Sequence, residues 1–471
     1  MASPKRVASI VAGLLSATTL FAGAQAHAQS LNLIRDTEIE ETIKKESTPV
    51  IVASGLRPED VHFYLVGDKE LNAFSAGGQN IFLNTGLIQE TDSPNQLIGV
   101  VAHEAGHIAG GHLVRGDIQR AGMKPFLLTM GLGVLAAIAG APDAAGALIV
   151  SSTQMGAMGA MTYSRVQEAS ADQAAANALE KSGESGKGLL EFFENYRYQE
   201  VFSDGRKYEY FRDHPLSEDR IEALRRRVEA APHYNEVDTP EMVAAHQIMK
   251  AKLHAFMDAP QQTFIKYKET DTSFIARYAR AIAYYKETEP EKALKQIDSL
   301  LADNPNNPYI WELKGQVLLE SGRPADAEAA HRRSVELKPD APLLRINLAQ
   351  ALIAQQQQGG TSLKDIARLD DAIGELKHAL VTEQDNAVAF QMLSQAYDAK
   401  HMDGQARLAA AEAHYAQGEL RDAKAFAMRA REKLTKDSPE WRRATDIILV
   451  SAPTQDDLRQ LARSDRGAGD N

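Results

Sequence analysis

Cysteine is absent from this chain of 471 residues. Its absence excludes disulfide bonds, thiolate metal ligands, a cysteine nucleophile and a lipid anchor attached through sulfur. Any metal ion must therefore be held by nitrogen and oxygen atoms. Positive charge is also in deficit, because 52 Lys and Arg face 64 Asp and Glu, a net charge of −12. Such a chain is repelled by phosphate backbones, so we expect no nucleic-acid partner.

The N-terminus has the pattern of an export signal and lacks the long apolar run of a membrane anchor. Lys5 and Arg6 precede an apolar stretch over residues 7–22, and Ala26-His27-Ala28 then matches a small-residue cleavage site. The stretch is shorter than a spanning helix requires, and Ser, Thr and Gly dilute it. We predict a signal peptide over residues 1–28, cleaved after Ala28, and a periplasmic mature chain.

Two kinds of pattern divide the mature chain. Residues 29–234 are mixed: the apolar runs 62–66 and 80–84 predict a small antiparallel sheet, and Ser93-Pro94 begins a predicted helix from residue 94 to about 115. Residues 235–462 read as helix only, and residues 463–471 as a disordered tail. The predicted fold is mainly α: an α+β metallopeptidase domain followed by an all-α superhelix.

A period of 34 residues, as between Pro305 and Pro339, runs through the helical part. Trp311, Gly315, Ala327 and Pro339 match the tetratricopeptide pattern at its own spacing. Such repeats bury their apolar faces only by stacking, which produces a superhelix with a concave surface. In a third unit, the glutamine-rich stretch 355–369 is typical of a long exposed loop between two helices.

Residues 126–162 form an apolar segment rich in Gly, Ala and Met, interrupted near its middle by a proline. Each half is too short to cross a bilayer alone. One interpretation is a buried helical hairpin that packs through small residues. Another is a mobile flap over the site that touches unfolded substrate or makes peripheral contact with a membrane. The sequence leaves both open.

Residues 103–107, His-Glu-Ala-Gly-His, form an H-E-x-x-H motif on the predicted helix. Side chains four residues apart share one helical face, so His103 and His107 can bind the same metal ion. Glu104 then lies beside the open coordination position, where its carboxylate can deprotonate the attacking water. The motif predicts a peptidase with one Zn²⁺ per chain, because nitrogen-rich tetrahedral sites favour zinc.

Two schemes could supply a third ligand. An extended motif requires histidine at position 113, which is Leu113, and His112 is one residue out of register. A later stretch fits better, because Glu168 and Asp172 are four residues apart and share one helical face. We predict that Glu168 binds the metal and that Asp172 accepts a hydrogen bond from a ligand imidazole.

A downstream stretch contains His214, followed by proline, and Arg220. Either side chain could donate a hydrogen bond to the oxyanion that develops during peptide hydrolysis. A lone histidine before proline is more often a turn residue. The residues alone therefore leave these two roles open.

The order of these motifs resembles the bacterial β-barrel assembly-enhancing proteases, in the peptidase group that includes the HtpX-type enzymes. The motifs are the signal peptide, H-E-x-x-H, S-R-x-x-E-x-x-A-D at 164–172, H-P-x-x-x-x-R-I at 214–221 and the repeats. The resemblance implies zinc on His103, His107 and Glu168. It implies that Glu104 is the general base and that His214 can close onto the zinc as a fourth ligand. It also implies an edge strand at residues 72–78, to which substrate could add as an extra strand.

The same resemblance implies a role in quality control of outer-membrane β-barrel proteins. The enzyme would assist their assembly and degrade unfolded or stalled ones, and the repeats would dock substrate or the barrel-insertion machinery. A second hypothesis belongs to another class: a chaperone or scaffold whose peptidase is normally held closed.

Overall fold

The structure is a computed structural model that describes residues 32–112, 164–197, 214–359, 363–457, 459 and 461. Residues 1–31, the apolar segment 126–162 and the tail 463–471 lie outside this description, so the expectations for them stay predictions. Within the described ranges, no helix is both long and apolar enough to cross a membrane.

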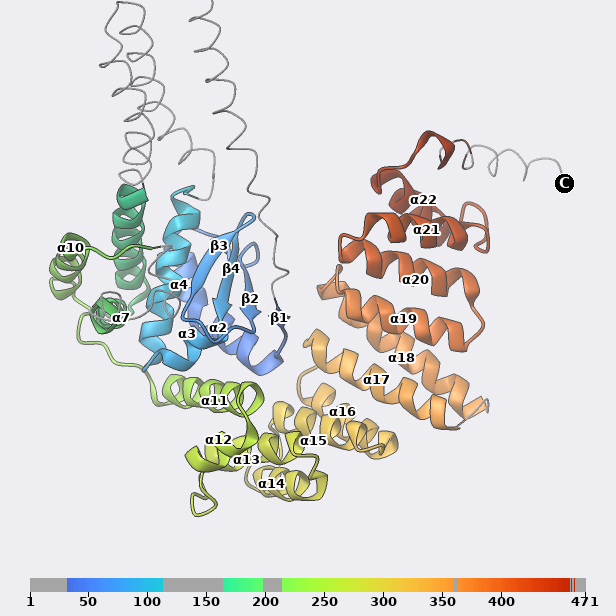
Figure 1. The fold of residues 1–471 in the computed structure, drawn as a ribbon, viewed down its shortest axis with the longest axis horizontal. Helices are drawn as coiled ribbons and strands as arrows, with labels where there is room; N and C mark the ends of the chain where they lie inside the picture. The colour runs from blue at the N-terminus through green and yellow to red at the C-terminus, as the bar shows by residue number, and fades with distance from the viewer. Residues whose placement is uncertain are drawn as a thin grey trace, which may run out of the picture.

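A four-stranded mixed sheet forms the centre of the N-terminal part (Figure 1). Its strands are β1 (Leu33–Ile34), β2 (His62–Val66), β3 (Ala73–Ala76) and β4 (Asn80–Asn84), in the order β1-β2-β4-β3. β2 and β4 run parallel, whereas β1–β2 and β3–β4 are antiparallel. The predicted antiparallel pairing of runs 62–66 and 80–84 is therefore wrong. Gly77 and Gly78, with φ of 60° and 105°, form the turn that brings β3 back against β4. β3 therefore occupies the side of β4 that faces away from β2.

Five labelled helices and one further helical segment accompany the sheet in the described N-terminal part. They are α2 (Thr37–Ala53), α3 (Thr85–Glu90), α4 (Pro94–Ala109), residues 164–182, α7 (Lys187–Arg197) and α10 (Glu218–Glu229). α2 and α4 contact the sheet, and α7 packs on α4. The core between these elements includes Ile81, Val101 and Phe192, each fully buried.

The start of α4 agrees with the prediction, but its end does not. The Ser93 side chain accepts a hydrogen bond from the backbone N–H of Gln96, and Pro94 is the first helical residue. The helix stops at Ala109 instead of residue 115. Gly110 caps it, and Gly111 adopts a left-handed φ of 66°, a conformation that ends a helix and favours glycine.

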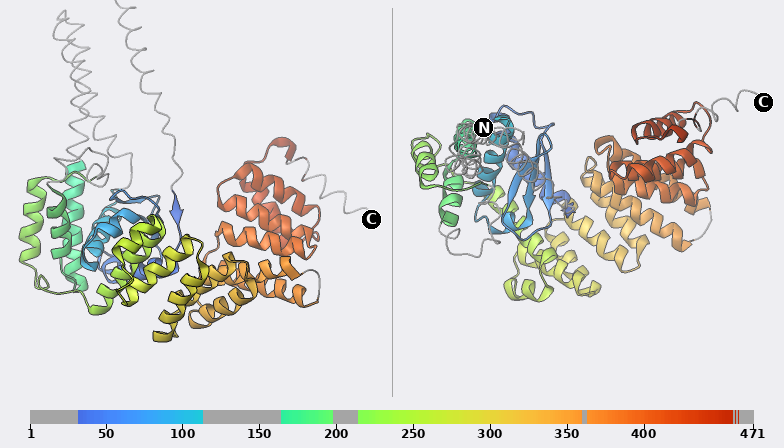
Figure 2. Two further views of the ribbon diagram at one scale, coloured as in Figure 1. Left: turned by 60° about the horizontal axis from the view of Figure 1, so that its bottom comes forward. Right: turned by 45° about the horizontal axis from the view of Figure 1, so that its top comes forward.

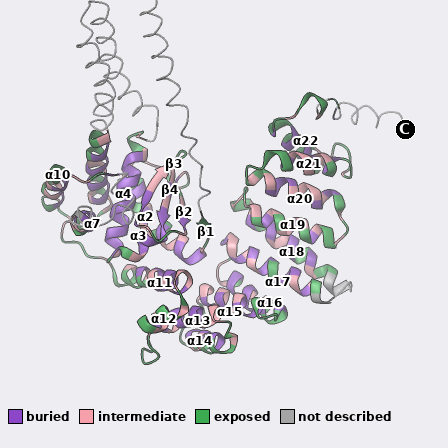
Figure 3. Cartoon of the chain, in the orientation of Figure 1, coloured by how far each residue is buried: buried purple, intermediate pink, exposed green. Residues whose placement is uncertain are grey.

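The remaining helices stack in antiparallel pairs into a curved arm (Figures 1 and 2). They are α11 (Pro240–Met257), α12 (Pro260–Lys266), α13 (Phe274–Lys286), α14 (Pro290–Asp303), α15 (Pro308–Glu320), α16 (Pro324–Leu337), α17 (Pro342–Gly359), α18 (Leu363–Thr382), α19 (Ala387–Ala399), α20 (Asp403–Ala416), α21 (Leu420–Arg431) and α22 (Pro439–Val450). Buried residues follow the facing sides of these helices (Figure 3). The mainly α fold class is thus confirmed. The predicted long loop is wrong, because most of residues 355–369 continue α17 and α18.

A polar junction joins the peptidase part to the arm. α11 packs on α2, α3 and α4 on one side and on α13 on the other. The buried Lys252 ammonium on α11 contacts two carboxylates at the start of α2. The contacts are Lys252–Asp36 (2.8 Å), Lys252–Glu38 (3.2 Å), Tyr278–Glu38 (2.8 Å), Tyr309–Glu41 (2.8 Å), Lys338–Glu41 (2.7 Å) and Arg35–Glu383 (2.6 Å).

Candidate metal centre

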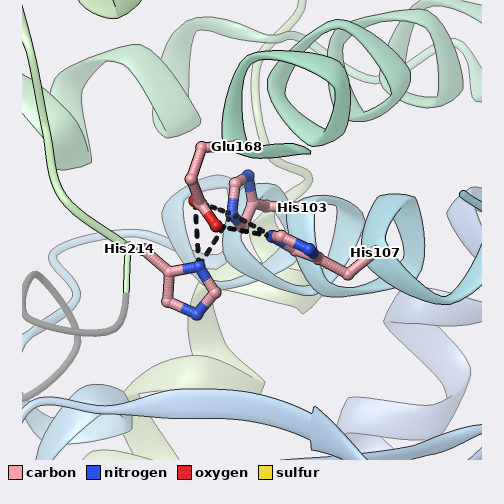
Figure 4. A group of neighbouring side chains, drawn as sticks. All are labelled: His103, His107, Glu168 and His214. Atoms are coloured by element: carbon pink, nitrogen blue, oxygen red, sulfur yellow. Dashed lines mark hydrogen bonds and ion pairs between the residues drawn. The ribbon is translucent and has the colours of Figure 1, made fainter. Parts of the chain in front are cut away.

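Four buried side chains from three elements meet at one point (Figure 4). His103 and His107 come from α4, Glu168 from the 164–182 helix, and His214 from the segment before α10. One ligand atom of each lies within 4.8 Å of the others. The structure therefore brings together the residues that the motifs indicated, which are far apart in the sequence.

A glycine allows the two ligand-bearing helices to approach each other closely. At Gly106, between the two histidines of α4, an added Cβ would lie only 2.9 Å from the carbonyl oxygen of Ala171. Any larger residue would push the 164–182 helix away from α4. The small residue in H-E-x-G-H thus helps to keep Glu168 within reach of the imidazoles.

The spacing of the candidate ligand atoms suits an ion with tetrahedral coordination. Bonds of 2.0–2.1 Å to zinc imply ligand atoms about 3.3 Å apart. His103 Nε2 lies 3.1 Å from His107 Nε2 and 3.3 Å from His214 Nδ1. Glu168 oxygens lie 3.4 Å from each α4 imidazole nitrogen and 3.0 Å from His214 Nδ1. Three imidazole nitrogens and the carboxylate of Glu168 form a donor set suited to zinc.

Glu104 lies beside this cluster and outside it. Its carboxylate is fully buried, and Oε2 accepts a hydrogen bond of 3.1 Å from Ser75 Oγ on β3. In the described chain Oε1 makes no hydrogen bond, although it lies 3.5 Å from His214 Nε2. A buried carboxylate oxygen without a donor is costly and is free to accept a proton. This position suits a general base.

Asp172 links His103 to Arg220. Its Oδ1 lies 3.0 Å from His103 Nδ1. The Arg220 guanidinium donates two hydrogen bonds to the same carboxylate, from Nε–H to Oδ2 (2.7 Å) and from Nη2–H to Oδ1 (2.8 Å). Arg220 Nη1 donates to the Pro215 carbonyl at 2.7 Å. Arg220 Nη1 also lies 3.3 Å from Glu168 Oε2, and the role of Arg220 as an oxyanion donor stays a prediction. Its geometry is that of a positioning residue.

Two polar neighbours of the centre could not be assigned from the sequence. His112, which is out of register for a metal ligand, lies with its Nδ1 3.2 Å from the outer Nδ1 of His107. The chain turns back at Gly110 and Gly111, and the His112 N–H donates to the His107 carbonyl. Ser75 lies within the expected edge strand, but only its pairing with β4 shows that its side chain faces Glu104.

The electrostatics of the centre favour a cation. Burial lowers the pKa of His103, but Asp172 and Glu168 outweigh burial and raise this pKa to about 9. Burial would raise the pKa of Glu168, yet hydrogen bonds from His103, His107 and His214 hold it well below its usual range. The anionic form of Glu168 is therefore stabilised, as a metal ligand requires.

This fold and centre define a metallopeptidase that carries a tetratricopeptide arm. The model of peptidase family M48 matches residues 35–228, and a tetratricopeptide-repeat model matches residues 278–342. The chain is 31% identical over 183 residues to the metalloprotease LoiP of Escherichia coli strain K12, an alignment that covers 38% of this chain and 67% of LoiP. The chain belongs to peptidase family M48 and is a metalloprotease.

Longer alignments connect the chain to proteins with both parts. It is 24% identical over 400 residues to the β-barrel assembly-enhancing protease of Escherichia coli strain K12, covering 83% of this chain and 78% of that protein. It is also 24% identical over 343 residues to the protein of that name from Yersinia pestis, covering 72% of this chain and 70% of that protein. The predicted resemblance is thereby confirmed.

Proposed function

We propose that this chain is a zinc-dependent endopeptidase of the periplasm. It degrades misassembled or stalled outer-membrane β-barrel proteins and assists their assembly. The observation that carries the proposal is the buried cluster of His103, His107, Glu168 and His214, whose ligand atoms lie within 4.8 Å of one another, with the Glu104 carboxylate beside them. The outer-membrane role is supported by the names of the relatives that share both parts of the chain.

His103, His107 and Glu168 would hold one zinc ion. When bound, zinc acidifies water and polarises a peptide carbonyl. Glu104 takes the proton from the attacking water and passes it to the leaving amine, as its buried position suits. Asp172 fixes the tautomer of His103 by accepting from Nδ1, and Arg220 holds Asp172 in place.

His214 holds the resting site closed. Its Nδ1 lies at the fourth corner of the cluster, 3.3 Å from His103 Nε2 and 3.0 Å from Glu168 Oε2. Catalytic zinc sites keep that position open for water or substrate, whereas closed sites fill all four positions with protein atoms. Withdrawal of the segment that carries His214 would open the site. This closed geometry also favours the second candidate function, a scaffold whose peptidase acts rarely.

The expected substrate is an extended segment that pairs with β3. In the described chain β3 is at the edge of the sheet and pairs only with β4. Its Ser75 contacts Glu104, so a chain added along β3 would pass the base. Main-chain hydrogen bonds would then supply affinity, as in other cases of strand addition. The arm would dock the substrate protein or the barrel-insertion machinery.

The test is complementation of a deletion strain with the wild-type chain and with Glu104→Gln. This variant keeps the ligands but lacks the base. The proposal predicts that a stalled β-barrel protein is degraded only with the wild-type chain and that the outer-membrane defect persists with Glu104→Gln. Full complementation by Glu104→Gln would favour the scaffold instead. Cell fractionation and the mature N-terminus test export, which predicts Gln29 as the first residue.

A further inference from the structure

Three aromatic rings stack across one face of the sheet, one from each of three adjacent strands. The centroids of Phe74 on β3 and Phe82 on β4 lie 4.8 Å apart with planes at 9°. Phe82 and Tyr64 on β2 lie 5.0 Å apart at 17°. The register pairs these residues directly, Phe74 with Phe82 and Phe82 with Tyr64. We call this row the aromatic ladder.

The aromatic ladder lies on the face opposite the core. Neighbouring positions on the strands, Ala73, Leu65 and Ile81, are almost completely buried in the main core. Because successive side chains of a strand point to opposite faces, the three rings lie on the other face. All three are partly exposed, and β3 is coloured as partly exposed in Figure 3. Within the described chain none of them belongs to the core clusters.

The ladder ends at the strand that borders the metal centre. Phe74 is its last ring, and the next residue, Ser75, points the other way and donates to Glu104 Oε2 at 3.1 Å. β3 thus presents the ladder on one face and a contact with the expected base on the other. At its edge, in the described chain, no further strand follows Phe74.

A strand that pairs with β3 would continue the ladder. Adjacent strands lie about 4.8 Å apart, which matches the ring separations of 4.8 and 5.0 Å within the ladder. A substrate residue directly across from Phe74 would therefore stack on its free side as a fourth ring. Its neighbours along the substrate would point toward the centre that contains Glu104.

We propose that Phe74 is a specificity-determining residue that binds an aromatic side chain of the substrate strand. The peptidase would then prefer extended segments with one aromatic residue at a fixed distance from the cleaved bond. The inference rests on the proposed peptidase function and narrows its substrate class. An aromatic residue paired across strands with another aromatic residue is favoured over alanine at the same position. The preference corresponds to roughly 2- to 12-fold in binding affinity.

The experiment compares quenched-fluorescent peptides that differ only in where a single Phe replaces Ala in an extended sequence. For the zinc-loaded chain, one position should raise kcat/KM by roughly 2- to 12-fold over the all-alanine peptide. Phe74→Ala, and the milder Phe74→Leu, should bring that ratio close to one. Tyr64→Leu is the matched control, because it removes the ladder ring farthest from β3 and should keep the ratio. Thermal unfolding checks that each variant is folded.

A binding measurement separates this inference from the peptidase function. Fluorescence anisotropy measures the binding of the Phe-containing and all-alanine peptides to Glu104→Gln, with and without Phe74→Leu. The ratio of the two Kd values reports the preference for Phe without any cleavage. Loss of the preference in the Phe74→Leu background supports the inference even if no peptide is cut. Cleavage or binding with no positional preference for Phe, or a preference that survives both Phe74 variants, would overturn it. Failure of the wild-type chain to cut any peptide would count against the peptidase function alone.

Discussion

The Nδ1 atom of His103 lies 3.0 Å from Oδ1 of Asp172. This contact orients the imidazole so that Nε2 points into the four-residue cluster. Asp172 is itself fixed by two hydrogen bonds from Arg220. The precision of the centre therefore depends on a carboxylate that is not one of the expected ligands.

Asp172→Asn should weaken zinc binding by about 10- to 100-fold, the usual effect of removing such an outer partner. The amide keeps the shape of the side chain but loses the charge that faces both His103 and Arg220. Competition with a chromogenic chelator measures the affinity. Asp371→Asn is the control, because Asp371 is ion-paired on the surface of the arm, with Arg332. Equal zinc affinity in both variants would argue against the role given to Asp172.

His214→Ala should raise the rate of casein cleavage while the chain still holds zinc through three ligands. If the open state of the wild-type site is populated at 10% or less, removing the His214 imidazole should increase the cleavage rate roughly tenfold or more. Steady-state cleavage and metal content are measured together. A loss of cleavage with full zinc content would instead indicate that His214 assists the reaction directly.

Lys252→Met should destabilise the junction between the peptidase part and the arm by about 3–5 kcal/mol, because it leaves Asp36 and Glu38 without their buried cation. Denaturant unfolding measures the free-energy change. Adding Glu38→Gln to Lys252→Met should recover part of the loss, since one uncompensated charge is then removed. No difference between the single and double variants would contradict this account of the junction.

His331→Phe should stabilise the arm at acidic pH. His331 is buried, and neither ring nitrogen has a hydrogen-bond partner in the described chain. It stands four residues after Ala327, where the repeat pattern places phenylalanine. Burial lowers the pKa of His331 to about 4, from 6.5 in the unfolded chain. Below pH 6.5 the unfolded state therefore binds a proton that the folded state rejects.

The wild-type arm should lose up to about 3 kcal/mol of stability from this residue as the pH falls from 6.5 to 4. Above pH 6.5 both states are neutral at this residue and its contribution does not vary. Urea unfolding at pH 7.5, 6 and 4.5 should show a smaller pH dependence for His331→Phe than for the wild-type chain. The same pH dependence in both would refute the assignment.

The sequence predicts the centre better than it predicts the sheet. Helical spacing is local, so His103 and His107 on one helix, and Glu168 and Asp172 on another, can be placed on shared faces from the sequence alone. Strand partners are not local. The parallel pairing of β2 with β4 depends on β3 occupying the other side of β4, which no pattern within either strand indicates.

Two other differences between the predicted and the observed structure also have physical causes. The contact of His112 with His107 depends on the turn at Gly110 and Gly111, which the predicted longer helix would have removed. The composition of the glutamine-rich stretch favours a loop, yet glutamine is a good helix former. Gln355 is buried and donates to the Pro324 carbonyl, so tertiary contacts support helix there.

The proposed zinc peptidase is tested most directly by metal content and casein cleavage, measured side by side for the purified mature chain and for Glu104→Gln. We expect about one zinc per chain in both proteins, with cleavage by the wild-type chain and none by Glu104→Gln. An absence of bound metal in both proteins would contradict it and would leave a repeat-bearing binding protein.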